Sequence, residues 1–346
     1  VDVFMSLKFR EGATYDKAGW YANLSPLLAS PAATAPDFNF NDFGEGLRRA
    51  ETVNGKLVGL PINLEGPLFY WNKDIFAKCS VAEPMFLEEI PEAAAKLKAC
   101  AARGDATVWA ARGIRGAISY AVSAFIYNSG GDFATPDGKP GLCLPGSVKG
   151  AEMYANLLKD YGPPGAANHT FTQVIEMLGQ GRLAMTHESS NEFANVMKFP
   201  GRSNDIGLKV LPKGKATGIS KPIVFGWGIS VSNYSTRKEA AWTFLQWATS
   251  NEMQTRLVKN GVAPPRGSVF NGPEFKAWTT ELPIRQSWAN ALIEISKTGT
   301  AVSYPPTDRV IEAREAVGGG VQKIFLGQGG AKDTMCAVDV ELAKLQ

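Results

Sequence analysis

The chain has 346 residues, of which 45% are hydrophobic and 20% are charged, and 36 basic against 33 acidic residues give a net charge of +3. This length exceeds one ordinary hydrophobic core and predicts two domains, while the composition excludes disordered and fibrous proteins. The balanced charge, with no cluster of basic and aromatic residues, argues against nucleic-acid binding. No uninterrupted apolar run reaches the roughly 18 residues that a membrane-spanning helix needs.

Short strand-like runs alternate with helical patterns along the whole chain. The predicted strands are 1–7, 57–62, 66–71 and 222–232, and the predicted helices are 87–103, 147–161, 170–181, 236–250 and 305–326. In the helix at 236–250, Trp242 and Trp247 are predicted to belong to the core. The alternation predicts an α/β architecture with mostly parallel sheets.

The four cysteines show no C-x-x-C spacing, so they do not indicate a zinc or redox site. Cys79 and Cys100 bracket one helical segment, which predicts a disulfide between them, and four buried free thiols are the alternative. Cys143 and Cys336 are isolated in the sequence.

Known catalytic motifs are missing from the sequence, which lowers the expectation of an enzyme. The chain has only two histidines, His169 and His187, and the segment "HESS" at 187–190 is followed by Asn191 where a zinc-binding helix needs its second histidine. Neither a G-x-S-x-G nucleophile turn nor a phosphate-binding glycine loop occurs. The sequence therefore predicts no catalytic residue, no metal and no cofactor.

One stretch, "VNGKLVGLPINLEGPLFYWNKDIF" at 53–76, resembles the first crossing segment of extracellular solute-binding proteins that serve ABC importers of sugars and polyols. The resemblance continues in order along the chain, in the segments 83–99, 125–141, 171–185, 235–254 and 261–270. Two further stretches, "WAARGIRGA" at 109–117 and "YGPPGAANHTF" at 161–171, are similar to the polyol-binding branch of this family.

The resemblance implies a monomeric, non-enzymatic receptor with two α/β lobes, a class II clamshell that closes over its ligand. It implies a periplasmic location, or a lipid-anchored one at the cell surface of a Gram-positive host, and a membrane permease as partner. The chain would cross between lobes near 62–66, 224–228 and 299–305. One lobe would then hold 1–62 and 229–300, and the other 67–223 and 305–346.

Family members begin with a strand, a helix and a second strand before the strand that matches residues 1–7. The resemblance therefore implies that this unit of the first lobe is missing from the sequence, which also opens without an export signal.

The ligand is expected to be a carbohydrate or sugar alcohol. Glu65, on the first crossing, could accept hydrogen bonds from two hydroxyl groups, and Arg112 could donate to adjacent hydroxyls through its planar fork. Trp227, between two glycines on the second crossing, could stack on the C–H face of a sugar. Arg266 follows two prolines and is predicted at the edge of the ligand cleft. Weaker candidates are Glu188, His187, Asn168, Trp109, Tyr304 and Trp20.

Several alternatives stay open at this point. Glu65 could form a salt bridge or cap a strand end, and Trp227 could pack inside a lobe. Glu65 and Glu188 could be the two carboxylates of a carbohydrate-active hydrolase. The cargo could also be a phosphorylated polyol, which would need more cationic groups, or a polyamine, which would need several acids.

Overall fold

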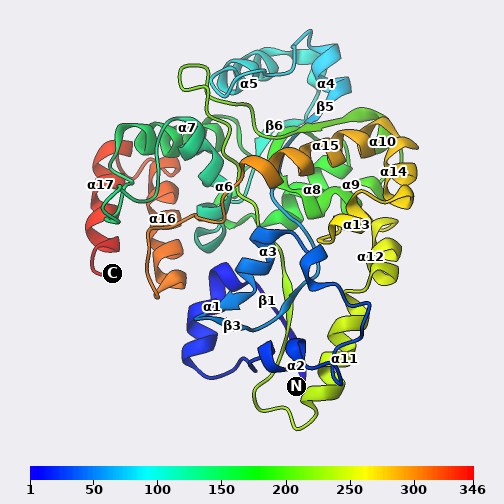
Figure 1. Cartoon of the computed structure of the whole chain (residues 1–346). Coiled ribbons are helices and arrows are strands. Elements are labelled where there is room, and N and C mark those ends of the chain that lie inside the picture. The colour runs from blue at the N-terminus through cyan, green and yellow to red at the C-terminus, as the bar shows by residue number, and fades with distance from the viewer. The chain divides into compact units, whose positions relative to one another are not determined.

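The computed structural model describes residues 1–346, which form two compact units (Figure 1). Unit 1 holds Val1–Glu65 and Val224–Arg285, and unit 2 holds Gly66–Ile223 and Gln286–Gln346. The chain therefore passes between the units three times. The first passage falls within the segment 62–66 and the second directly before the segment 224–228. The third differs, because it lies at Arg285 and Gln286 rather than at 299–305.

The third passage lies before the expected segment because most of one helix, α15 (Pro283–Thr298), packs in unit 2. Trp288, Leu292 and Ile295 form an apolar stripe along this helix, and all three are fully buried. The Trp288 indole N–H donates to the carbonyl of Ser190 at 3.0 Å, and its ring stacks on Phe193. Both partners belong to unit 2, so most of α15 joins that unit.

Unit 1 is built on a small antiparallel sheet whose central strand is β9 (Gly228–Val231). Strand β1 (Val3–Ser6) pairs with one edge of β9, with Phe4 opposite Ser230. Strand β4 (Leu60–Pro61) pairs with the other edge, with Leu60 opposite Ile229. A hairpin of β2 (Thr52–Val53) and β3 (Lys56–Leu57) turns at Asn54 and Gly55, both at positive φ, as the Asn-Gly pair favours.

Unit 1 also contains seven helices. They are α1 (Lys8–Lys17), α2 (Ser25–Ala29), α3 (Glu45–Ala50), α11 (Lys238–Ala248), α12 (Asn251–Val258), α13 (Gly267–Phe270) and α14 (Pro273–Thr280), with a 3₁₀ turn η1 (Phe40–Asp42). Of these, α11 packs on β9 and α3 on β4. Trp242 of α11 is fully buried in the core, as predicted, but Trp247 is 53% exposed. The helix is apolar on two faces, and its buried face is the one with Ala241, Trp242 and Leu245.

Unit 2 contains a four-stranded sheet in the order β6-β7-β5-β8. The strands are β5 (Pro67–Asn72), β6 (Thr107–Ala110), β7 (Leu183–Ser189) and β8 (Ile206–Lys209). Only β6 and β7 are parallel, so the prediction of mostly parallel sheets is wrong in both units. The reason is that β5 and β9 each follow directly on a passage between the units, and this passage rather than a helical crossover sets their direction.

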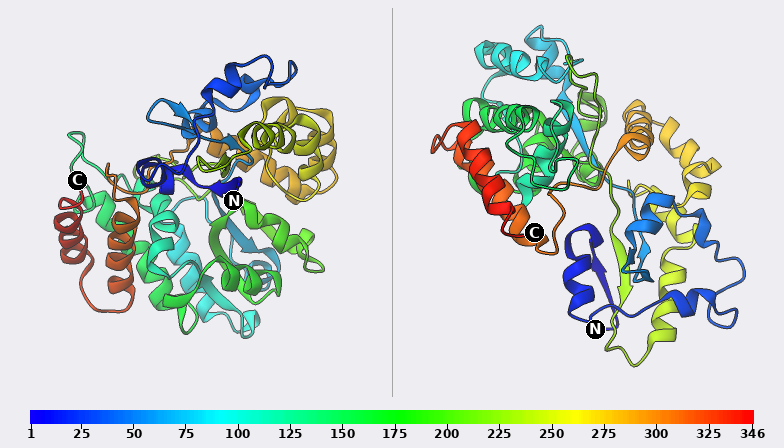
Figure 2. Two further views of the ribbon diagram at one scale, coloured as in Figure 1. Left: turned by 90° about the horizontal axis from the view of Figure 1, so that it is seen from below. Right: turned by 60° about the vertical axis from the view of Figure 1, so that its left-hand side comes forward.

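Helices make up most of the rest of unit 2. They are α4 (Lys73–Lys78), α5 (Glu89–Ala99), α6 (Arg115–Asn128), α7 (Pro145–Tyr161), α8 (Phe171–Gly179), α9 (Phe193–Met197), α10 (Arg202–Asp205), α16 (Val310–Phe325) and α17 (Ala331–Leu342), with 3₁₀ turns η2 (Ala101–Arg103), η3 (Ala166–Asn168) and η4 (Ser190–Glu192). Helix α6 is buried at every residue from Ile118 to Asn128, because α7 and α16 pack against it. Figure 2 shows α16 and α17 side by side on the outer side of this helical layer.

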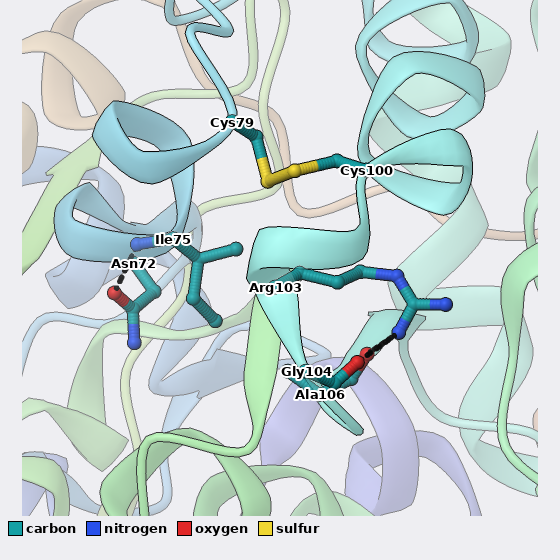
Figure 3. Close-up of a disulfide and its surroundings, with 7 residues drawn as sticks. All are labelled: Asn72, Ile75, Cys79, Cys100, Arg103, Gly104 and Ala106. Carbon is teal, nitrogen blue, oxygen red and sulfur yellow. Dashed lines mark hydrogen bonds between the residues drawn. A yellow bond between two sulfur atoms is a disulfide. The ribbon is translucent and has the colours of Figure 1, made fainter.

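Two disulfides stabilise unit 2. The predicted bond between Cys79 and Cys100 is confirmed and joins the end of α4 to the end of α5, with Cα atoms 5.7 Å apart (Figure 3). The alternative of four free thiols is wrong, since Cys143 and Cys336, although isolated in the sequence, form a second disulfide. They are 193 residues apart in sequence, and α17 brings them together. Asp339 of α17 supports the same junction by accepting from the backbone N–H groups of Leu142 and Cys143, each at 2.8 Å.

None of the helices combines the length and the hydrophobicity that crossing a lipid bilayer requires.

Candidate ligand-binding site

The two predicted crossing segments pair with each other in unit 1. The N–H of Ile62 donates to the carbonyl of Trp227 at 2.8 Å, and Glu65 and Phe225 exchange both backbone hydrogen bonds, at 2.7 and 2.9 Å. The Asn63 side chain accepts from the N–H of Trp227 at 2.7 Å. Glu65 and Trp227 therefore lie on one antiparallel ribbon, although 162 positions separate them in the sequence.

Trp227 contributes an aromatic face to this ribbon. It is half-buried, and the guanidinium of Arg10 lies 5.4 Å from its ring centroid. The neighbouring Phe225 contacts Phe9, with ring centroids 4.9 Å apart. The Arg10 guanidinium is in turn paired with the carboxylate of Glu11. Such an arrangement offers flat apolar faces beside hydrogen-bond donors, which suits the two sides of a sugar ring.

Sequence reasoning missed Phe9 and Arg10. Both stand in the first turn of α1, directly after strand β1. Helix α1 buries Lys8, Glu11 and Gly12 and leaves Phe9 half-exposed, which is the reverse of an ordinary amphipathic helix, so apolar periodicity could not mark these residues. The carboxylate of Glu65 is likewise buried, at 6% exposure of the residue.

Arg266 lies inside unit 1, which differs from the predicted position at a cleft edge. Its guanidinium donates to the carbonyls of Thr249 and Asn39, the latter at 2.8 Å, and pairs with Asp42 at 3.4 Å. The rings of Phe38 and Phe43 lie 5.0 and 4.0 Å from it. Burial lowers the pKa of Arg266. The two preceding prolines aim the side chain inward, and its contacts are those of a structural residue.

Trp20, the remaining candidate of unit 1, is 46% exposed. Its ring packs on Tyr15 at 4.7 Å, and Tyr15 contacts Phe4 and Tyr21. Trp20 therefore belongs to an aromatic cluster around β1, separate from the contacts of Trp227.

In unit 2 the sheet register brings Arg112 and Glu188 together. Strands β6 and β7 are parallel, with Ala110, the last residue of β6, opposite Thr186, and Arg112 follows the end of β6 while Glu188 lies further along β7. The Nε of Arg112 donates to both oxygens of Glu188, at 2.9 and 3.0 Å, and Nη2 donates to Oε1 as well. The Glu188 side chain is fully buried and that of Arg112 is 17% exposed.

Aromatic residues and a loop hold Arg112 in place. Its guanidinium lies 4.8 Å from the ring of Tyr120 and 5.5 Å from that of Phe171. The hydroxyl of Tyr154 donates to the carbonyl of Arg112 at 2.6 Å. The next residue, Gly113, donates to the carbonyl of His169 at 3.0 Å, and a Cβ at position 113 would lie only 1.8 Å from the carbonyl oxygen of Ala166.

A second carboxylate lies near this pair. Glu192 ends the 3₁₀ turn after β7, and its Oε2 accepts from the amide of Asn195 at 2.8 Å. Burial, and the charge of Glu188, raise the pKa of Glu192, although Asn195 and Arg112 oppose the shift. The sequence did not single out Glu192. It becomes notable only because its charge interacts with those of Glu188 and Arg112 in the folded protein.

His187 and Trp109 lie in the core of unit 2 rather than at an accessible surface. Successive residues of a strand face opposite sides of the sheet, so His187 faces away from Glu188 and packs on Phe125 of α6. Its Nδ1 lies 3.2 Å from the carbonyl of Ala121, and burial lowers the pKa of the imidazole to about 3. Trp109 is fully buried and also contacts Phe125. Both placements differ from a ligand-contacting position.

The last two candidates of unit 2 lie on loops. Asn168 is exposed at the end of the turn η3. Tyr304 is half-buried in the segment 299–305, and burial raises its pKa to about 12. Of the predicted residues, the structure thus joins Glu65 with Trp227 in unit 1 and Arg112 with Glu188 in unit 2. No group of three or more His, Cys, Asp and Glu side chains gathers where it could hold a metal ion.

Comparison with known proteins finds relatives that align over nearly the whole chain. A probable amino-acid ABC transporter periplasmic-binding protein of Sinorhizobium fredii is 26% identical and aligns over 92% of this chain and 74% of its own length. A mannitol-binding protein of Pseudomonas aeruginosa is 23% identical over 98% of this chain and 79% of its own. The crystal structure of an ABC transporter solute-binding protein from Agrobacterium radiobacter K84, in complex with ribitol, matches with a TM-score of 0.84 at 22% identity, covering 100% of this chain and 85% of that one.

The structural match establishes the two-lobe fold of periplasmic solute-binding proteins. The family model for bacterial extracellular solute-binding proteins matches residues 1–255, which is more than two thirds of the chain. The chain belongs to the family of bacterial extracellular solute-binding proteins.

Proposed function

We propose that the protein captures a sugar or sugar alcohol outside the cytoplasm and delivers it to the permease of an ABC importer. The pairing of segments 62–65 and 225–227 carries the proposal, because it sets a carboxylate, Glu65, and an indole, Trp227, on one ribbon where the chain passes between the units. Hydroxyl groups bind carboxylates and guanidinium groups, and C–H faces stack on indoles.

Relatives support this class of cargo. One relative is named for mannitol, and a structural neighbour holds ribitol. Another relative is named for amino acids, so amino acids are the second candidate cargo. A polyamine has less support, because none of the relatives and structural neighbours described above is named for one.

A hydrolase is disfavoured by the surroundings of Glu188. Its carboxylate is bound by the guanidinium of Arg112, whereas the acid of a glycosidase must donate a proton to the leaving oxygen. We therefore propose binding without covalent chemistry. Incubation with sugars and analysis for products tests this point, and turnover that disappears in Glu65→Gln would contradict it.

A location outside the cytoplasm, in the periplasm or at the cell surface, is supported by the two disulfides of unit 2, since such bonds persist in oxidising compartments. Hinge motion at the passages, closure of the lobes over the ligand and a monomeric state remain predictions from the family resemblance.

The test of the cargo is a thermal-shift screen of the purified protein against sugars, sugar alcohols, amino acids and polyamines. A ligand that binds only the folded form raises the melting temperature by mass action. We expect a shift with at least one sugar or sugar alcohol, confirmed by calorimetric titration. A shift with an amino acid or a polyamine alone would overturn the proposed cargo.

A further inference from the structure

An arginine at a binding site ordinarily attracts anions. The guanidinium group is always charged at neutral pH, and its planar fork matches the oxygens of carboxylates and phosphates. Arg112 is the cation that follows strand β6 in unit 2, and 17% of its side chain is exposed. Taken alone, it would favour a carboxylate or phosphate on the ligand over a neutral hydroxyl.

Arg112 is not alone, however, because Glu188 is bound to it. Three hydrogen bonds join the two side chains, two of them from Nε at 2.9 and 3.0 Å. Glu188 is fully buried, and its Oε1 also accepts from the N–H of Ser189 at 2.7 Å. Glu188 is a residue of β7, and Arg112 lies just beyond the end of the neighbouring parallel strand β6, where Tyr154 donates to its carbonyl, so both backbones are held by the surrounding structure.

One further carboxylate, Glu192, lies near the pair, and the cation that accompanies it, Lys198, interacts with that carboxylate. Glu192 belongs to the turn directly after β7, and its charge interacts with those of Glu188 and Arg112. The π faces of Tyr120 and Phe171 lie 4.8 and 5.5 Å from the guanidinium and also favour a cation there. Two carboxylates thus accompany one guanidinium at this edge of the sheet.

From this balance we infer that Glu188 is a specificity-determining residue, which neutralises Arg112 so that the edge accepts uncharged polyhydroxylated ligands and rejects anionic ones such as aldonates and polyol phosphates. The inference rests on the proposed function and narrows its cargo. A neutral hydroxyl needs only the donor geometry that Arg112 keeps within the pair. An anion needs net positive charge, which the pair lacks, and it is repelled by the nearby carboxylates.

The experiment compares a neutral ligand with an anion of the same hydroxyl chain. The pair is the sugar or polyol with the largest thermal shift and its aldonate: ribitol with ribonate, mannitol with mannonate, or maltose with maltobionate. Dissociation constants are measured by calorimetric titration at one ionic strength. For the wild type we expect the aldonate to bind at least a hundredfold more weakly than the neutral ligand.

In Glu188→Gln, which keeps the shape of the side chain but removes its charge, we expect the ratio of the two dissociation constants to fall at least tenfold in favour of the aldonate. The double variant Arg112→Gln with Glu188→Gln has no guanidinium and should show no such gain. Glu252→Gln is the matched control, since Glu252 pairs with Arg256 on the surface of unit 1, and its ratio should equal that of the wild type.

Three results would overturn the inference. A wild type that binds the aldonate as tightly as the neutral ligand contradicts it even if Glu188→Gln does not fold. A folded Glu188→Gln with the wild-type ratio contradicts it while leaving the proposed function intact. Failure of the wild type to bind any sugar or polyol contradicts the proposed function, and the inference falls with it.

Discussion

At the scale of single residues, the two arginines predicted at the ligand site have different surroundings. Arg112 is bound to one carboxylate at the edge of a sheet, and part of it reaches the surface. Arg266 is enclosed, and its guanidinium joins carbonyls of two separate segments, at Asn39 and Thr249. Residue type is the same at both sites, and the two prolines before Arg266 predicted a position at the cleft edge that its contacts do not show. Only the three-dimensional partners separate a structural arginine from a candidate binding one.

This difference predicts the effect of Arg266→Lys. A lysine cannot reproduce the planar fork, so buried carbonyls lose their donors and the free energy of unfolding should fall by about 1–3 kcal/mol. The affinity of the folded protein for its sugar should stay unchanged. Urea unfolding and calorimetric titration measure the two quantities. Arg256→Lys, at an exposed ion pair, is the control and should leave both values as they are. A large loss of affinity in Arg266→Lys would restore the arginine to the ligand site.

His187 makes stability depend on pH. Its pKa is about 3 in the folded protein, because burial disfavours the charged form, while an unfolded histidine titrates near 6.5. Between these values the unfolded chain binds the extra proton, so stability is fully present above about pH 6.5 and falls as the pH decreases. By linkage, the contribution lost at pH 5 is about 2 kcal/mol.

The variant His187→Asn should therefore lose less stability than the wild type between pH 7 and pH 5. Urea unfolding at the two pH values measures this difference. His169→Asn is a suitable comparison, because the chain has only these two histidines and His169 is the less buried one. An identical decrease in the wild type and His187→Asn would show that other groups cause the acid sensitivity.

At the scale of elements, the sequence predicted strands β1, β4, β5 and β9 and the helices α5, α7, α8, α11 and α16, because apolar periodicity and turn residues are local signals, but it missed β6, β7 and β8 and the other helices. It did not predict their partners. Strand direction in both sheets depends on where the chain enters each unit, and the pairing of Arg112 with Glu188 depends on the register of β6 on β7. Helix α11 shows the limit of periodicity, since Phe244 and Trp247 are apolar but face outward. Phe9 and Arg10 were missed because their partners, Phe225 and Trp227, lie far away in the sequence and meet them only in the folded protein.

The junction between β6 and α6 depends on Gly113. A Cβ there would lie 1.8 Å from the carbonyl oxygen of Ala166, so Gly113→Ala must displace the loop 163–170 or the segment after β6 that contains Arg112. We expect a loss of about 1–3 kcal/mol in unfolding free energy, and weaker sugar binding because Arg112 shifts. Gly46→Ala is the control, since it lies in α3 with open space around it and should stabilise the helix by up to about 1 kcal/mol. Equal stability and affinity of the two variants would contradict this role for Gly113.

At the scale of the whole molecule, both disulfides lie in unit 2, and unit 1 contains no cysteine. The chain-entropy model gives each bond a stabilising contribution of about 3–5 kcal/mol, larger for the bond that spans 193 residues. Reduction should therefore accelerate backbone hydrogen exchange in unit 2 and leave unit 1 largely unchanged. Mass spectrometry of peptides from each unit, with and without reductant, measures this. Equal acceleration in both units would mean that the two do not unfold separately.

The central proposal is that Trp227 and Arg112 each take part in binding an uncharged, hydroxyl-rich ligand. Its most direct test is calorimetric titration of the best sugar or polyol into the wild type, Trp227→Ala, Arg112→Gln and the control Trp247→Ala, whose tryptophan is exposed on α11. We predict that Trp227→Ala and Arg112→Gln each weaken binding at least about tenfold, the loss of about 1.4 kcal/mol or more, while Trp247→Ala binds like the wild type. Wild-type affinity in either of the first two variants would contradict the claim.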